Sequence, residues 1–367
     1  MPKKSPRNPR RSSSKPAKTA KPANAAKRGA KAPRARRAGV WRTAANSDRH
    51  ELYELAVQEV VAECDFIDKA WRAHRGRLAT TIREDFCGTA KACTEWARRR
   101  PTNHAIGVDL DRSVILWGER RHRAHLPESI ASRITILEAN VLDVATPEVE
   151  TILAMNFSYF IFKDRATLVA YFRRCFESLS KDGLLLCDAY GGSEAHSEVE
   201  EERSLDGFTY VWDQNQYNPI TGDVVNHIHF RFPDGSEMKR AFTYRWRLWS
   251  LPEIQDAMRE AGFAKTTVYW EGTDHKTGGG NGVFKPSTRG EACAGWIAFI
   301  VAEKGAPKPA TRKGKRAGSP AKARSKYGRE GTRRSNDLPS PCDSATIDWS
   351  NSPTPHEFCD SHLPACT

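Results

Sequence analysis

The sequence predicts an α/β protein whose central sheet is mainly parallel and covered by helices on both faces. In the middle of the chain, short runs that are apolar throughout alternate with helical stretches. Strands buried on both faces have this composition, and their alternation with helices is typical of parallel sheets. From Phe208 to Leu248 the apolar residues recur at every second position instead, which predicts antiparallel strands.

The uneven distribution of charge separates a folded body from two basic ends. The 367 residues carry a net charge of +13, but residues 1–43 hold 15 basic residues and no acidic one. Residues 305–367 hold 11 basic and 6 acidic residues, which leaves 32 basic and 39 acidic residues for 44–304. We therefore expect one folded domain over 44–304 and disordered ends, the second basic to about residue 335.

The basic ends allow two interpretations, an electrostatic arm for nucleic acid or another polyanion and a solubilising tail. The mildly acidic body argues against a domain whose whole surface binds nucleic acid. Cys342, Cys359, His362 and Cys366 could supply zinc ligands, but their spacing is not that of a standard finger. Incidental cysteines are the favoured interpretation, and we expect no metal.

Composition also excludes several classes of protein. No apolar run approaches the roughly 18–20 residues that a membrane helix needs. The N-terminus lacks the apolar segment of a secretory signal. Nine cysteines in a chain of this length are too few for a disulfide scaffold. We expect a soluble protein in a reducing, cytoplasmic environment.

The elements of the parallel part follow in order along the chain. A helical pattern comes first, with Ser47 and Asp48 as candidates for its cap. The expected strands are 78–82, 105–108, 134–137, 152–155 and 184–187, and the expected helices are 48–73, 88–100, 112–124 and 164–179.

After the fifth strand, the period-two pattern predicts a three-stranded antiparallel insertion at about 206–249. Its strands are expected at 208–217, 224–232 and 238–248, separated by turn signals at 218–222 and 233–235. Ser250 and Glu253 form a capping box that opens a helix ending at Gly262. Two final strands, 265–270 and 295–302, are joined by a glycine-rich loop.

The residues that follow the parallel strands are the informative ones, because ligands bind at the carboxyl ends of such strands. Gly88 and Thr89 form a tight turn at a helix N-terminus, where neither the G-x-G-x-x-G pattern nor the P-loop pattern is present. Asp109, 21 residues further on, could accept hydrogen bonds from a ribose diol. Asn140 could bind an adenine edge and Val141 could pack on its face. The alternatives are that Gly88 only ends a strand and that Asp109 only caps a helix.

With these features in order, residues 80–303 resemble the S-adenosylmethionine-dependent methyltransferases with the seven-stranded Rossmann-like fold. The resemblance implies S-adenosylmethionine as cofactor and a sheet whose last two strands form an antiparallel hairpin. Phe86 and Ala90 stand where this family commonly has glycine, so we expect the turn to differ at Phe86. The resemblance implies the following cofactor-binding residues: Glu84, Phe86, Cys87, Gly88, Thr89, Asp109, Leu110, Asn140, Val141 and Asn156.

Methyl transfer to a small molecule is the function that this resemblance implies. The reaction is an in-line displacement that mainly requires alignment, so no dedicated base is demanded. The candidates for contact with the reacting atoms follow strands four and five: Asn156, Tyr159, Asp188 and Tyr190. Asn156 and Asp188 could equally close turns, and the tyrosines could be packing residues.

The insertion supplies candidates for substrate binding. They are His227, His229, Arg231, Arg245 and Arg247, and such a set would suit an anionic acceptor such as a carboxylate. The alternatives are a solvated sheet face for the histidines and surface ion pairs for the arginines.

Two other functions remain open. One is a nucleic-acid- or ribosome-associated methyltransferase tethered by its basic ends, and the other is a non-catalytic binding protein that keeps the fold. Asn156-Phe-Ser-Tyr159 occupies the position where amino-methylating DNA enzymes carry N-P-P-Y, but both prolines are missing. The body therefore gives no support for base methylation. The sequence sets neither the acceptor atom nor the oligomeric state.

Overall fold

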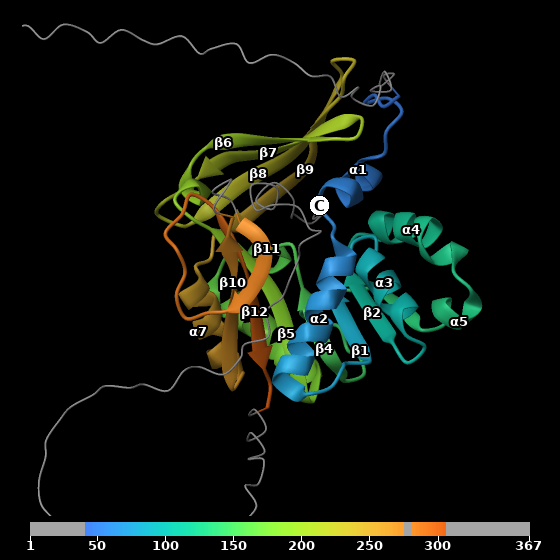
Figure 1. Ribbon diagram of the computed structural model, residues 1–367, viewed down its shortest axis with the longest axis vertical. Helices are drawn as coiled ribbons and strands as arrows, with labels where there is room; N and C mark the ends of the chain where they lie inside the picture. The colour runs from blue at the N-terminus through green and yellow to red at the C-terminus, as the bar shows by residue number, and fades with distance from the viewer. Residues whose placement is uncertain (1–40, 275–279, 306–367) are drawn as a thin grey trace, which may run out of the picture. The chain divides into compact units, whose positions relative to one another are not determined.

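The computed structural model describes residues 41–274 and 280–305 (Figure 1). The described residues lie within one compact unit. The predictions for the basic ends, and for the segment from Cys342 to Cys366, concern residues that lie outside this part of the chain, apart from 41–43 and Gly305. Within the described part, no helix is both long enough and apolar enough to cross a membrane.

The main sheet is mostly parallel, as the sequence predicts. Its order is β11-β10-β12-β5-β4-β1-β2-β3. Strands β1 to β5 pair in parallel, while β12 runs antiparallel to β5 and β10 antiparallel to β12. The strands are β1 (Thr81–Asp85), β2 (His104–Asp109), β3 (Ile134–Glu138), β4 (Val149–Ala154), β5 (Leu179–Gly191), β10 (Lys265–Thr273), β11 (Gly280–Pro286) and β12 (Trp296–Glu303).

The strand β11 was not predicted. It pairs antiparallel with β10 at the edge of the sheet and gives the sheet an eighth strand. Its sequence reads as part of a glycine-rich loop because only Val283 and Phe284 are apolar in its centre. Phe284 packs on Phe299 of β12 with ring centroids 4.5 Å apart, and this contact fixes the strand.

Seven α-helices surround the main sheet in the described residues. They are α1 (Arg49–Ala56), α2 (Val60–Arg75), α3 (Lys91–Arg99), α4 (Arg112–Arg121), α5 (Glu128–Ala131), α6 (Arg165–Ser178) and α7 (Leu251–Ala261). The helix predicted over 48–73 is two helices, α1 and α2. Asp48 caps α1 by accepting hydrogen bonds from the backbone N–H groups of His50 and Glu51. The break at 57–59 contains neither glycine nor proline, so the sequence carries no signal for it.

Two hydrogen bonds near the C-terminal end of α2 show how this helix is oriented on the sheet. Near its C-terminal end, Trp71 Nε1 donates to Thr151 Oγ1 at the start of β4 over 2.7 Å. Arg75 Nε donates to the Asp182 carbonyl, near the start of β5, over 2.6 Å. The N-terminal end of α2 therefore lies toward the carboxyl ends of these strands, where Figure 1 also shows α1.

A second sheet follows β5 and is antiparallel, with the order β6-β7-β8-β9. It lies over one end of the main sheet, next to α1 (Figure 1). Its strands are β6 (Val199–Leu205), β7 (Phe208–Tyr217), β8 (Asp223–Arg231) and β9 (Glu237–Arg247). Three strands were predicted, and β6 is a fourth. Its sequence, Val-Glu-Glu-Glu-Arg-Ser-Leu, has no apolar period, so only its pairing with β7 identifies it.

One face of this insertion sheet is aromatic and packs on the main body. Phe242 and Tyr244 of β9 lie on this face with Ile228 of β8, which is the register partner of Phe242. Trp246 meets Phe160 of the short 3₁₀ helix η2 (Ser158–Ile161) at 6.2 Å between ring centroids. Phe242 meets Tyr53 of α1 at 5.1 Å. The insertion is therefore fixed to the carboxyl end of β4 and to α1.

Candidate functional site

The turn after β1 adopts the left-handed backbone conformation at every second residue. The φ angles are 59° at Phe86, 51° at Gly88 and 55° at Ala90. Non-glycine residues in this region cost roughly 1–2 kcal/mol each. The backbone at Phe86 is thus in the conformation that glycine favours, and the expectation that the turn differs from that of the family stays a prediction. The Phe86 ring packs against Phe162 and Tyr171, at 6.0 and 5.8 Å between centroids.

Asp109 joins this turn to the end of β2. Its Oδ2 accepts a hydrogen bond from the Gly88 backbone N–H over 2.7 Å, and its Oδ1 accepts one from the Asp111 N–H over 2.8 Å. The cap of α4 is Asp111, which accepts from the N–H groups of Ser113 and Val114. The alternative interpretation, in which Asp109 only caps this helix, is therefore wrong. Burial raises the pKa of Asp109, against the opposing effect of these two hydrogen bonds.

A cavity of about 200 Å³ opens beside Asp109, at the carboxyl ends of β1, β2 and β3. Its lining residues are Phe86, Asp109, Leu110, Asp111, Ala139, Asn140, Val141, Leu142, Ile161 and Phe162. Five of the predicted cofactor-binding residues meet here: Phe86, Asp109, Leu110, Asn140 and Val141. Asn140 Oδ1 accepts from the Leu142 N–H over 3.0 Å, so the amide keeps its NH₂ group as a donor.

The predicted residues Cys87 and Thr89 have side chains that contact the protein interior. Cys87 is buried against Gly107, where an added Cβ would come within 2.8 Å of its sulfur. Thr89 Oγ1 donates to Glu54 Oε1 over 2.6 Å. Both side chains therefore hold the turn against the rest of the protein.

The other two predicted cofactor residues, Glu84 and Asn156, do not line the 200 Å³ cavity. Glu84 Oε2 accepts from the Cys93 N–H over 3.2 Å, at the first turn of α3. Burial raises the pKa of Glu84 to about 7. Asn156 ends the turn after β4 with a φ of 60°, and no hydrogen bond of its side chain occurs within the described part of the chain.

Glu54 of α1 is a residue that the sequence patterns do not single out. Its Oε1 accepts from Thr89 and lies 2.5 Å from His122 Nε2, while Lys91 Nζ donates to its backbone carbonyl over 3.1 Å. Glu54 thereby ties α1 to the turn, to α3 and to the end of α4. A glutamate on a helix face carries no local sign of burial, so no sequence signal marks it.

Two of the four catalytic candidates support the turn after β4. Asp188 accepts hydrogen bonds from the Asn156 and Phe157 N–H groups over 2.7 and 2.8 Å, and both donors have left-handed backbones. Tyr159 donates to the Asp188 carbonyl over 2.7 Å. Both side chains are enclosed, with 1% and 0% exposure, and burial raises the pKa of Asp188 to about 7. The contacts therefore favour the turn-closing interpretation for Asp188 and the packing interpretation for Tyr159.

Tyr190, the fourth candidate, lies at the end of β5. Its ring packs on Phe157 and Phe160, at 4.8 and 5.7 Å between centroids. It also lines a second cavity of about 340 Å³. That cavity is lined by Tyr190, Gly191, Gly192, His196, Tyr217, Pro219, Ile220, Thr221, Gly222, Arg247, Leu248, Trp249, Ser250, Glu253 and Trp296.

Of the five predicted substrate residues, only Arg247 lines this second cavity. Its guanidinium lies 3.7 Å from the centre of the Trp249 ring, and Nη2 forms an ion pair with Glu253 Oε1 at 3.1 Å.

The remaining four alternate with the aromatic-face residues along β8 and β9, as Arg247 does, but they do not line the cavity. They are His227, His229, Arg231 and Arg245. The five residues predicted for one anion site thus do not gather.

The histidines are also not on a solvated face, because His227 and His229 are 4% and 7% exposed. His227 Nδ1 lies 2.9 Å from Thr243 Oγ1. Burial lowers the pKa of His227, and the Arg240 charge adds to this effect. Arg231 forms ion pairs with Glu200, Glu202 and Glu237, which agrees with the alternative interpretation of a surface pair.

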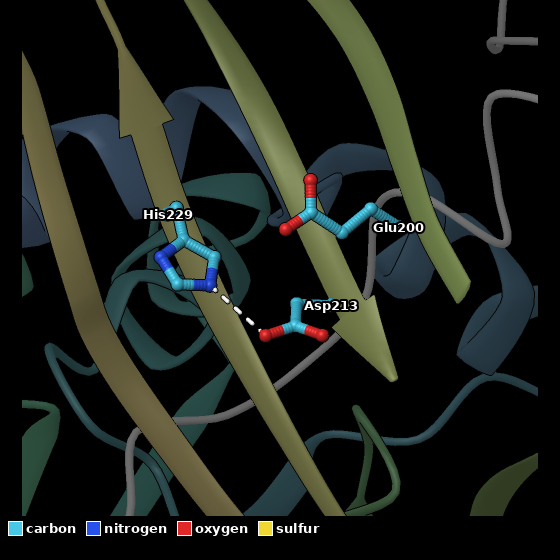
Figure 2. Close-up of side chains that lie close together, drawn as sticks. All are labelled: Glu200, Asp213 and His229. Carbon is cyan, nitrogen blue, oxygen red and sulfur yellow. Dashed lines mark hydrogen bonds and ion pairs between the residues drawn. The ribbon is translucent and has the colours of Figure 1, made fainter. Parts of the chain in front are cut away.

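His229 belongs to a cluster with Asp213 and Glu200 (Figure 2). Its Nδ1 accepts the Arg240 backbone N–H over 3.0 Å, so in the neutral ring Nε2 carries the proton and donates to Asp213 Oδ2 over 3.2 Å. Nε2 then has no lone pair for a metal, and Glu200 is held by Arg231. The arrangement is that of a hydrogen-bonded ion-pair cluster.

No family model matches the chain, and no curated protein sequence matches it. A solved S-adenosylmethionine-dependent methyltransferase from Clostridium acetobutylicum is similar in structure, with a TM-score of 0.52 at 14% identity over 70% of this chain and 98% of that chain. An amino pentose methyltransferase from Micromonospora echinaspora gives 0.49 at 14% identity, over 70% and 95% of the two chains. The first match shows that this chain has the Rossmann-like fold of the methyltransferases, with an antiparallel insertion sheet.

Proposed function

We propose that the chain is an S-adenosylmethionine-dependent methyltransferase that acts on a small molecule. The observation that carries the proposal is the cavity around Asp109, which lies at the carboxyl ends of β1, β2 and β3 in a methyltransferase fold. Ligands of open parallel sheets bind at this place.

The residues of the cavity fit the nucleoside part of the cofactor. Val141 and Phe162 offer apolar surfaces for a purine ring, and the Asn140 amide offers a donor for a ring nitrogen. A carboxylate has about four lone-pair directions, and Asp109 uses two of them for Gly88 and Asp111. The remaining two suit the hydroxyls of a ribose.

When bound, the cofactor supplies a methyl group on a positively charged sulfur, and the leaving thioether is neutral. The chain's own residues then have to align the acceptor and exclude water. Asn156 and Tyr190 follow the ends of β4 and β5 and are the residues that we propose to contact the acceptor. Asp188 and Tyr159 act through the turn that carries Asn156, so they are positioning residues.

We further propose that the 340 Å³ cavity holds the acceptor, since Tyr190 forms part of its wall. Its size is that of a site for a small molecule. Arg247 is the one predicted anion-binding residue that lines it. The Arg247→Gln variant should lower turnover of an anionic acceptor and leave cofactor affinity unchanged. Arg245→Gln is the matched control, because Arg245 is an exposed arginine of the same strand that does not line the cavity. Equal effects of the two variants would refute this assignment.

Calorimetric titration of the full chain with S-adenosylmethionine and S-adenosylhomocysteine tests the proposed function. Asp109→Ala should lower the affinity for both ligands by about tenfold or more, because hydrogen bonds to a charged group contribute roughly 1.5–3 kcal/mol. Asp256→Ala, an exposed carboxylate of α7 paired with Arg259, is the control. Absence of binding to the wild type, or full affinity in Asp109→Ala, would refute the proposal.

A further inference from the structure

Glu63 is a buried carboxyl group at the same end of the sheet that the function described so far does not use. It lies near the N-terminal end of α2, which points toward the carboxyl ends of the strands. The residue is 8% exposed. Within the described part of the chain, its side chain forms neither a hydrogen bond nor an ion pair, and it is not among the residues with other contacts.

The charged groups that face Glu63 are mostly of its own sign. They are Glu84 of β1, Asp188 of β5 and Glu59 before α2, with Lys91 of α3 as the one cation. Lys91 Nζ donates to the Glu54 carbonyl and forms no ion pair with Glu63 within the described residues. Two buried carboxyls, Glu63 and Asp188, and the half-buried Glu84 therefore come from three elements with little compensating positive charge.

The three carboxyls differ in their partners. Asp188 accepts two backbone N–H groups, and Glu84 accepts the Cys93 N–H through Oε2. Glu63 has no donor, yet its oxygens are not among the fully enclosed unpartnered atoms, so they reach accessible space. A carboxyl group that is nine-tenths buried and has no hydrogen-bond partner is rare, and the accessible oxygens of Glu63 can accept a hydrogen bond from a bound group.

We propose that Glu63, together with Glu84, receives a positively charged group of the methionyl end of S-adenosylmethionine. This inference rests on the proposed function. The cofactor has two such groups, an ammonium and a sulfonium. Glu84 precedes the Gly88 turn by four residues, so a nucleoside bound at Asp109 would extend its methionyl end over this turn toward both glutamates.

The inference makes a prediction about protons. Burial and the nearby Glu84 charge raise the pKa of Glu63 to about 8, so Glu63 is mainly protonated at pH 7 in the free protein. An entering cation favours the ionised form, so binding should release a proton. Cofactor affinity should accordingly rise between pH 6.5 and pH 8.

The test is calorimetric titration of the full chain at pH 7 in two buffers of different ionisation enthalpy. The ligands are S-adenosylmethionine, S-adenosylhomocysteine, which lacks the sulfonium, and 5′-methylthioadenosine, which lacks both charges. Glu63→Gln should lose at least half of the proton release and about tenfold in cofactor affinity, with methylthioadenosine unaffected. Loss for the first two ligands alike supports the ammonium as the bound group, and loss for S-adenosylmethionine alone supports the sulfonium.

Several outcomes would overturn the inference. One such outcome is that the wild type binds the cofactor with no proton release between pH 6.5 and 8. Another is that Glu63→Gln lowers the affinity for methylthioadenosine as much as the affinity for the cofactor. The exposed neighbour Glu59→Gln is the matched control, and an equal loss there would also overturn it. Thermal unfolding at pH 8 checks the fold, because Glu63→Gln removes a buried charge and should be at least as stable as the wild type. Absence of any binding to the wild type refutes the proposed function instead.

Discussion

Gly118 of α4 packs against the turn after β1 and does not line the 200 Å³ cavity. A Cβ atom added at Gly118 would lie 2.1 Å from the Thr89 carbonyl oxygen and 2.6 Å from its carbonyl carbon. Both atoms are backbone, so no side chain can move aside. The helix and the turn would have to separate by about 1 Å to restore an ordinary contact.

Two opposing contributions set the magnitude for Gly118→Ala. Helix propensity alone favours alanine over glycine by about 1 kcal/mol. Overpacking a well-filled contact costs about 1–3 kcal/mol and occasionally more, and a clash with backbone belongs at the upper end. We expect a net loss of about 2 kcal/mol in the free energy of unfolding. Cofactor affinity should fall by about tenfold or more, since Thr89 carries Gly88 with it and Gly88 donates to Asp109.

Denaturant unfolding and calorimetric titration of the full chain measure the two effects. Arg120→Ala, at an exposed position of the same helix, is the control and should change stability by no more than about 0.5 kcal/mol. A Gly118→Ala variant that is more stable than the wild type, as propensity alone would give, and that binds the cofactor normally would refute the reasoning.

Three further predictions concern stability. Ala90→Gly should raise the free energy of unfolding by about 1 kcal/mol in denaturant titration, because φ at Ala90 is 55°; a loss would contradict the strain. Burial alone would raise the pKa of Glu303, but hydrogen bonds from His74 and Arg75 outweigh it and lower the pKa to about 2. Glu303→Gln should therefore lower the free energy of unfolding by about 2–4 kcal/mol at pH 7, and this loss should shrink as the pH falls from about 4.5 to 2. A loss that stays constant across that pH range would contradict the pairing. Arg231→Gln, which removes exposed ion pairs, should cost at most about 1 kcal/mol in thermal unfolding, less in high salt, and leave cofactor affinity unchanged; tenfold weaker binding would place Arg231 in the site.

Part of the lining of the 200 Å³ cavity could be predicted from the sequence, because these residues directly follow apolar strands. Asp109, Asn140 and Val141 each come within a few residues of a strand end, and the parallel order of the strands brings those ends together. The left-handed turn at Phe86 could not be predicted, since φ there contradicts the ordinary preference of a phenylalanine.

Residues whose role depends on tertiary contacts could not be predicted from sequence patterns. Glu54 and Glu63 are glutamates on short amphipathic helices, and a sequence gives no sign that such residues face inward. The strand β6 has three consecutive glutamates and no apolar period, so only its register with β7 identifies it as a strand. The histidines of β8 follow the predicted alternation. The Arg240 backbone N–H that His229 accepts lies at a register shift between β8 and β9, which the sequence pattern does not predict.

The structure of the full chain with S-adenosylhomocysteine bound is the most direct test of the account. The account predicts the adenine beside Val141 within hydrogen-bond reach of Asn140, and the ribose hydroxyls about 2.6–3.2 Å from the Asp109 carboxylate. The methionyl end should extend over the Gly88 turn toward Glu84. A ligand in the cavity beside Trp249 and Trp296, or an Asp109 carboxylate without contact to the ligand, would contradict it.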